Sequence, residues 1–214
     1  PIPGYVRGVL RILAERGETI QPGDVIMHND AYAGASHGPD VGFIVPVFHE
    51  DALIAFATTT AHHLDIGALT PGSCGIVDAI DAYAEGLQFK AIKVYEQGQK
   101  VVPVWHLLRD NIRVSDLVVG DMEAQIAAAR FGAEQLGELI NRYGLTTFAA
   151  ACDAVMNYAE RLMRQAIAAL PVEAKGPRNS ANSIITPVAV QRRNISNRVR
   201  GGFAALRVIR AGDR

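Results

Sequence analysis

The chain has 214 residues, enough for one domain with a hydrophobic core, and it is 49% hydrophobic and 20% charged, as is usual for a soluble globular protein. Its formal net charge of −1 excludes a general electrostatic affinity for nucleic acids or membrane surfaces. Cys74 and Cys152 are too few and too far apart for a disulfide framework, so a cytoplasmic location is expected. The sequence has neither an apolar run of about 18–20 residues nor the apolar segment of a signal peptide.

The first elements predicted are a short helix and a strand. Apolar residues recur on one face of Tyr5–Arg16, and Gly17 suits the end of a helix. The turn at residues 21–23 precedes a strand at Asp24–His28, and a glycine-rich loop follows at residues 29–40. That loop lacks the spacing of the known phosphate-binding loops, so no nucleotide site is expected on this chain.

Residues 41–60 are predicted to form a β-hairpin, because an apolar run is interrupted by the polar triplet at 49–51. With Glu50 at the tip, Asp40 faces Thr60, and His62 lies diagonally from Asp40 on the same face of the strands. His63 then lies on the opposite face. A two-residue turn would shift the register by one and reverse these faces.

Three side chains near the open end of this hairpin are candidate metal ligands. His37 and Asp40, spaced H-x-x-D around Gly38-Pro39, can reach one ion if the loop curls, and His62 can supply a third donor. Two imidazoles and one carboxylate leave positions for water or substrate, which is typical of catalytic sites and suits Zn, Mn or Fe. The alternative is that these histidines make ordinary hydrogen bonds.

Asp30, Asp65 and His63 lie close to these ligands in the sequence. We expect them to support the ligands or to transfer protons, and they are the candidate catalytic residues.

The second half of the chain is predicted to be mainly helical. Residues 86–102 alternate loosely as short strands with a turn at 97–98, and a helix is expected at Trp105–Ile112. Two long helices, at Asp121–Tyr143 and from about residue 146 to Leu170, carry apolar seams with steps of three and four residues. We expect them to form an antiparallel helical hairpin, whose seam either packs internally or makes a subunit interface. Cys152 lies on the seam, which favours a buried structural thiol.

Residues 172–214 differ from the rest in composition. They hold nine Lys/Arg and two Asp/Glu, with Phe203 as their one aromatic residue. This favours a disordered or out-of-frame terminus over an RNA-binding arm. The predicted organisation is therefore an α+β domain at 1–171, with a mixed or antiparallel sheet region at 18–104 and a helical hairpin region at 105–171, followed by a basic tail.

Several motifs occur in the order that is typical of one enzyme family. They are GDVIMHNDAYAGASHGPD at 23–40, AHHLDIG at 61–67, TPGS at 70–73 and YAEGLQFKAIKVYEQGQ at 83–99. Together they resemble the hydantoinase B/oxoprolinase (HyuB-like) family over about residues 3–171. The family includes subunits of hydantoinases, 5-oxoprolinases, caprolactamase, and the acetone and acetophenone carboxylases. The resemblance assigns metal ligands to His37, Asp40 and His62, and a further aspartate ligand to a segment before Pro1.

The resemblance implies a function as well as a site. It implies hydrolysis of a cyclic amide such as a hydantoin or 5-oxoproline, with ATP bound by a HyuA-like partner subunit in a hetero-oligomer. ATP-dependent carboxylation of a ketone is the first alternative. The second is a non-catalytic remnant that binds no metal. Both ends of the sequence lead us to expect a fragment of a larger subunit.

Overall fold

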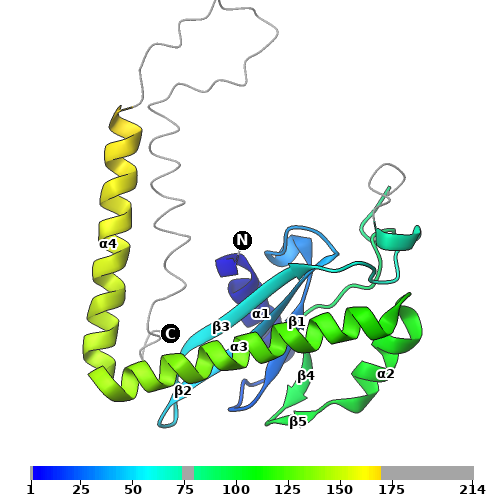
Figure 1. Cartoon of the computed structure of the whole chain (residues 1–214), viewed down its shortest axis with the longest axis horizontal. Coiled ribbons are helices and arrows are strands. Elements are labelled where there is room, and N and C mark those ends of the chain that lie inside the picture. The colour runs from blue at the N-terminus through cyan, green and yellow to red at the C-terminus, as the bar shows by residue number, and fades with distance from the viewer. Residues whose placement is uncertain (1, 74–79, 170–214) are drawn as a thin grey trace, which may run out of the picture. The chain divides into compact units, whose positions relative to one another are not determined.

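The computed structural model describes residues 2–73 and 80–169 (Figure 1). The predicted tail at 172–214 and Cys74 lie outside the described residues. The described chain divides into two compact units, one ending at Arg142 and one beginning at Tyr143, and each is described by itself.

The first unit is built on a five-stranded antiparallel sheet with the strand order β3-β2-β1-β4-β5. The strands are β1 (Val25–His28), β2 (Asp40–His49), β3 (Ala52–His62), β4 (Ile92–Glu96) and β5 (Gln99–Lys100). The predicted turn at Gln97-Gly98 joins β4 to β5, and both of its residues have positive φ. Together with the helices, this sheet confirms the α+β class.

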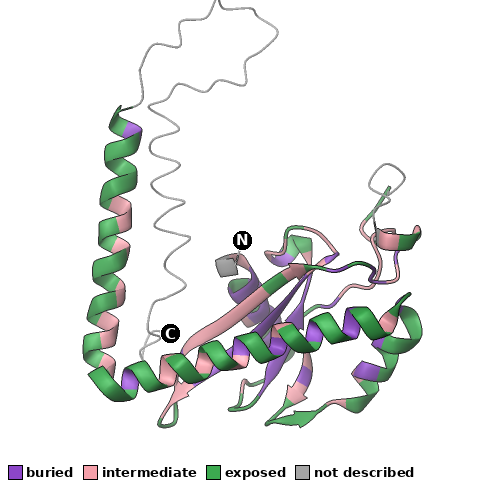
Figure 2. Cartoon of the chain, viewed as in Figure 1, coloured by how far each residue is buried: buried purple, intermediate pink, exposed green. Residues whose placement is uncertain are grey.

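Helices cover both faces of the sheet, which explains why β1 and β2 are almost entirely apolar (Figure 2). Val25, Met27 and Phe43 pack with α2 (Val102–Asn111) and α3 (Ser115–Tyr143). Ile26 and Ile44 point the other way, against α1 (Ile2–Arg16). The two-residue alternation therefore separates two apolar clusters, one on each face.

The β2–β3 hairpin forms with a register that differs from the predicted one. Its turn is the two residues Glu50 and Asp51, so His49 pairs with Ala52. A bulge then places Ile54 out of register, and Asp40 pairs with His62 instead of Thr60. The prediction that Asp40 faces Thr60 was wrong, because a two-residue turn and a bulge each shift the pairing by one. The two shifts together keep Asp40 and His62 on one face, directly opposite each other.

The helices confirm most of the predicted elements but begin at different residues. α1 starts at Ile2, and α3 starts at Ser115, earlier than the predicted Asp121. The glycine-rich loop contains a short 3₁₀ helix, η1 (Ala31–Ala33), and a second, η2 (Pro71–Ser73), forms in the TPGS turn. α4 (Leu145–Ala169) follows Gly144, and its antiparallel packing with α3 stays a prediction.

None of the helices in the described part of the chain is long and apolar enough to cross a membrane.

Candidate metal centre

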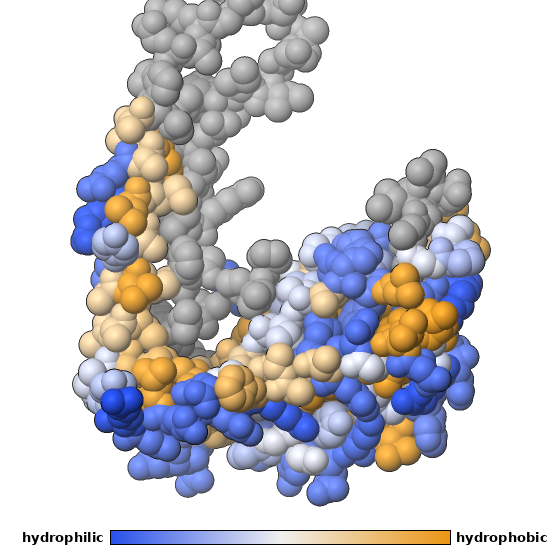
Figure 3. All heavy atoms as spheres, viewed as in Figure 1, coloured by the Kyte–Doolittle hydropathy of each residue, from blue (hydrophilic) through white to orange (hydrophobic). Residues whose placement is uncertain are grey.

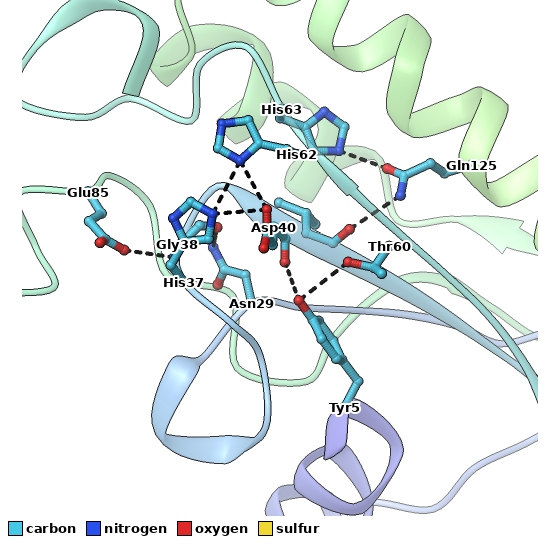
Figure 4. Close-up of polar contacts among 11 residues, drawn as sticks. Tyr5, Asn29, His37, Gly38, Asp40, Thr60, His62, His63, Glu85 and Gln125 are labelled. Atoms are coloured by element: carbon cyan, nitrogen blue, oxygen red, sulfur yellow. Dashed lines mark hydrogen bonds and ion pairs between the residues drawn. The ribbon is translucent and has the colours of Figure 1, made fainter. Parts of the chain in front are cut away.

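The three predicted metal ligands lie together at the open end of the β2–β3 hairpin (Figure 4). Asp40 Oδ1 is 3.0 Å from His37 Nε2 and 3.0 Å from His62 Nδ1. The two imidazole nitrogens are 3.2 Å apart, and the rings are stacked. Asp40 begins β2 and His62 ends β3, so strand pairing joins these two ligands, while the turn after Ser36 brings His37 to them.

The separations of these atoms fit a divalent ion. Metal–ligand bonds of about 2.1 Å place neighbouring donors roughly 3.0 Å apart in an octahedron and roughly 3.4 Å apart in a tetrahedron. The His62 side chain is 52% exposed and that of His37 is 30% exposed, so further positions around an ion could be reached by water or substrate. His37, Asp40 and His62 could therefore hold a metal ion.

The carboxyl group of Asp40 is held in its charged form, which is the form that binds a metal. Its partial burial opposes ionisation, but hydrogen bonds donated by Ser36 and His62, together with the charge and hydrogen bond of His37, lower its pKa below the usual 3.8.

Two side chains from distant parts of the chain hold Gly38, which lies between His37 and Asp40. The Gly38 amide donates to Glu85 Oε2 at 2.7 Å, and its carbonyl accepts from Asn29 Nδ2 at 2.7 Å. Gly38 does not have a positive φ. A Cβ added at Gly38 would lie 3.0 Å from Glu85 Oε2 and 3.2 Å from Glu85 Cβ, so the Glu85 side chain would have to shift by a few tenths of an ångström.

Residues on both faces of the sheet fix the strand that begins at Asp40. From α1, the Tyr5 hydroxyl donates to the Asp40 carbonyl at 2.7 Å. From α3, Gln125 Nε2 donates to the Val41 carbonyl at 3.3 Å. Neither residue was predicted, because nothing in a single sequence indicates which helical residues contact the end of a strand. Asn29 and Glu85 also were not predicted, although both belong to the motifs that carry the family resemblance.

His63 points away from the ligands, as the parity of the hairpin predicted. Its side chain is buried, and Nε2 lies 2.7 Å from Gln125 Oε1, so this nitrogen carries the proton and donates it. Burial lowers the pKa of the ring, which is therefore neutral. Among the described residues, the buried His63 Nδ1 has no hydrogen-bond partner.

The carboxylates of Asp65 and Asp30 accept hydrogen bonds from backbone amides of the loops next to the site. Asp65 is 1% exposed and accepts from the Gly67 and Gly72 amides and from Arg113. Its burial opposes ionisation, but these hydrogen bonds outweigh it and lower its pKa. Asp30 caps η1 by accepting from the Tyr32 amide. Their predicted catalytic roles stay predictions.

Comparison with known proteins agrees with this arrangement of motifs. Residues 3–200 match the family described as hydantoinase B/oxoprolinase. The chain belongs to this family. The match continues beyond residue 171, where the sequence motifs predicted that the resemblance would end.

Two relatives show how much of a family member the chain represents. It is 66% identical over 171 residues to a putative D-/L-hydantoinase subunit of Pseudomonas sp. (strain NS671), covering 80% of this chain and 29% of that protein. The crystal structure of ATP-dependent caprolactamase from Pseudomonas jessenii matches with a TM-score of 0.69 and 32% identity, covering 80% of this chain and 30% of that one. The chain thus spans less than a third of either relative.

A second solved structure shares the fold. Acetone carboxylase matches with a TM-score of 0.62 and 22% identity, over 68% of this chain and 20% of that one. At this level of identity the likeness concerns the fold alone.

Proposed function

We propose that this chain carries the metal-binding part of a hydrolase subunit that opens cyclic amides, of the hydantoinase B/oxoprolinase type. The observation that supports it most is the convergence of His37, Asp40 and His62 at the mouth of one hairpin. The similarity to a hydantoinase subunit and to caprolactamase supports the substrate class, because a hydantoin and a lactam both contain a ring amide.

In this proposal each ligand has a defined part. On binding an ion, His37 Nε2 and His62 Nδ1 would coordinate it as unprotonated ring nitrogens, and the Asp40 carboxylate would supply negative charge. A bound divalent ion would lower the pKa of a water to about 7 and polarise the amide carbonyl. Tyr5 and Gln125 hold the backbone at the start of β2 in place, so Asp40 needs little rearrangement on binding.

ATP is assigned to a partner subunit. The relative from Pseudomonas jessenii is named as ATP-dependent, whereas this sequence has no glycine-rich phosphate-binding pattern. The hydantoinase relative is named as one subunit of its enzyme, which supports assembly with another. We assign ATP binding to a HyuA-like partner in a hetero-oligomer.

The remaining site residues have contacts that suit support more than proton transfer. Both carboxylate oxygens of Asp65 accept backbone amides, and Asp30 is paired with the Tyr32 amide and with Lys90 at 3.6 Å. His63 is buried and donates to Gln125. We assign all three to holding the loops and strand end around the ligands.

Metal content tests the site directly. The purified chain, loaded with Zn²⁺, Mn²⁺ or Fe²⁺ and desalted, should retain about one equivalent of one of these ions. His37→Ala and His62→Ala should lose most of it, because each removes one of three donors. His49→Ala is the matched control, since His49 lies at the closed end of the same hairpin. Equal metal in all four proteins would favour the non-catalytic remnant.

The reaction is tested with the partner subunit present. Ring opening of hydantoin, 5-oxoproline and a lactam is measured with ATP, alongside fixation of labelled bicarbonate on acetone. ATP-dependent ring opening that is lost in Asp40→Asn is the expected result. Bicarbonate fixation without ring opening would replace the hydrolase by the ketone carboxylase.

A further inference from the structure

Glu85 is a carboxylate that touches the ligand-bearing turn but is not one of the clustered donors. Its Oε2 accepts the Gly38 amide at 2.7 Å, and among the described residues the donor group contains only His37, Asp40 and His62 (Figure 4). The accepted amide belongs to the peptide bond that joins His37 to Gly38. The hydrogen bond therefore acts on the backbone next to a ligand, and not on the ion.

The backbone around Glu85 is itself firmly held. The Leu69 amide donates to the Ala84 carbonyl at 3.0 Å, and the Leu87 amide donates to the Ile66 carbonyl at 2.8 Å. Gly86 has φ +115, and a Cβ there would lie 2.5 Å from the Ile66 carbonyl oxygen. Backbone hydrogen bonds to residues 66–69 therefore hold the chain just before and just after Glu85.

Asn29 binds the carbonyl group of Gly38, whereas Glu85 binds its amide. It is 1% exposed, and its Nδ2 donates both to the Gly38 carbonyl and to the Leu87 carbonyl at 2.9 Å. Its Oδ1 accepts the Phe89 amide at 2.6 Å. The two peptide units that meet at Gly38 are therefore both tied to the segment 84–89.

We propose that Glu85 is a positioning residue that fixes the His37–Asp40 turn and thereby sets the affinity of the site for a divalent ion. This inference rests on the proposed function, because it requires that His37, Asp40 and His62 bind metal. Glu85 acts as a hydrogen-bond acceptor for one backbone amide. A neutral side chain of the same shape should therefore replace it.

The test compares Glu85→Ala with Glu85→Gln in the full chain, using titration calorimetry with Zn²⁺ and with Mn²⁺. Glu85→Ala removes the acceptor and should weaken binding by about 10–100-fold, as is typical when a group that orients a ligand is lost. Glu85→Gln retains an acceptor oxygen and should bind nearly as tightly as the wild type. Glu15→Ala, at an exposed glutamate of α1, is the control and should change nothing.

A second measurement works without metal. Hydrogen exchange of the Gly38 amide, followed by NMR, should be fast in Glu85→Ala and slow in both Glu85→Gln and the wild type. Thermal unfolding of each variant shows that the fold is intact. A wild-type chain that binds no metal would overturn the proposed function and its link to affinity, whereas the exchange pattern would still report on the turn.

Two results would overturn the inference alone. One is wild-type metal affinity in Glu85→Ala. The other is a Glu85→Gln variant as weak as Glu85→Ala, which would mean that the charge of Glu85 matters, as for a ligand or a base.

Discussion

Histidines in this protein have opposite roles according to their burial. His37 and His62 are partly exposed and face a carboxylate, whereas His28 and His63 are almost completely buried and hydrogen-bonded as neutral rings. His28 accepts the Ala91 amide at Nδ1 and donates from Nε2 to the Ala33 carbonyl, so it joins β1 to two loops. The residue type alone does not separate these roles.

Burial lowers the pKa of His28 below 6.5, and this predicts how stability depends on pH. As pH falls through about 6.5, the unfolded chain takes up a proton that the folded chain refuses, so the free energy of unfolding should decrease. The slope should reach at most about 1.4 kcal/mol per pH unit for each such histidine. Denaturant unfolding between pH 7.5 and 5.5 measures it.

His28→Gln should be less stable overall but should show a flatter pH dependence than the wild type, while His49→Gln should keep the wild-type slope. An unchanged slope in His28→Gln would mean that His28 does not cause the pH dependence of the free energy of unfolding between pH 7.5 and 5.5.

Close backbone packing defines the position of α1. An added Cβ at Gly8 would lie 1.6 Å from the Ala33 carbonyl oxygen, and one at Gly42 would lie 2.5 Å from the Tyr5 ring. At Gly8 the backbone of α1 therefore lies directly against η1, and at Gly42 the Tyr5 ring of α1 lies directly against the backbone of β2. This close approach is what brings the Tyr5 hydroxyl to the Asp40 carbonyl.

Two helical glycines should respond to alanine in opposite directions. Gly8→Ala should lower the free energy of unfolding by about 1–3 kcal/mol, because the methyl group meets backbone that must shift. Gly120→Ala, in α3, should raise it by up to about 1 kcal/mol, since no described residue outside the helix backbone lies within 4 Å of an added Cβ and alanine is the better helix former. Thermal and denaturant unfolding of both variants checks this. Stabilisation by Gly8→Ala would contradict the packing of α1.

The two compact units differ in how their apolar residues are used. The first contains both buried clusters and all three candidate ligands. On α4, which belongs to the second unit, Val155, Tyr158, Leu162 and Met163 are between 45% and 65% exposed, and Figure 3 shows apolar side chains along this helix. Cys152, predicted to be buried on that seam, is only half-buried.

A chain ending at Arg142 should retain the metal centre. The residues of both buried clusters precede this point, as do His37, Asp40 and His62, so the metal affinity should stay within about twofold of that of the full chain. Calorimetric titration and denaturant unfolding of the shortened chain measure this. Loss of cooperative unfolding or of metal binding would show that the first unit depends on residues after Arg142.

Local patterns in the sequence were enough to predict the element types, the family and the three candidate ligands. Helical and strand periodicities are local, and the candidate ligands lie in short motifs that can be recognised along the chain. The same patterns placed His63 on the opposite face. The pairing of Asp40 with His62 could not be obtained in this way, since the two-residue turn and the bulge at Ile54 each shift the register by one and leave no signal in the local pattern.

The groups that hold the ligands became visible only in the folded chain. Tyr5, Asn29, Glu85 and Gln125 reach the site from four separate segments through contacts with backbone groups. A backbone amide or carbonyl is the same at every position, so no sequence pattern indicates which one a distant side chain will bind. The capacity of a side chain to bind a metal is a local chemical property, whereas the arrangement of the three candidate ligands depends on packing between elements that are far apart along the chain.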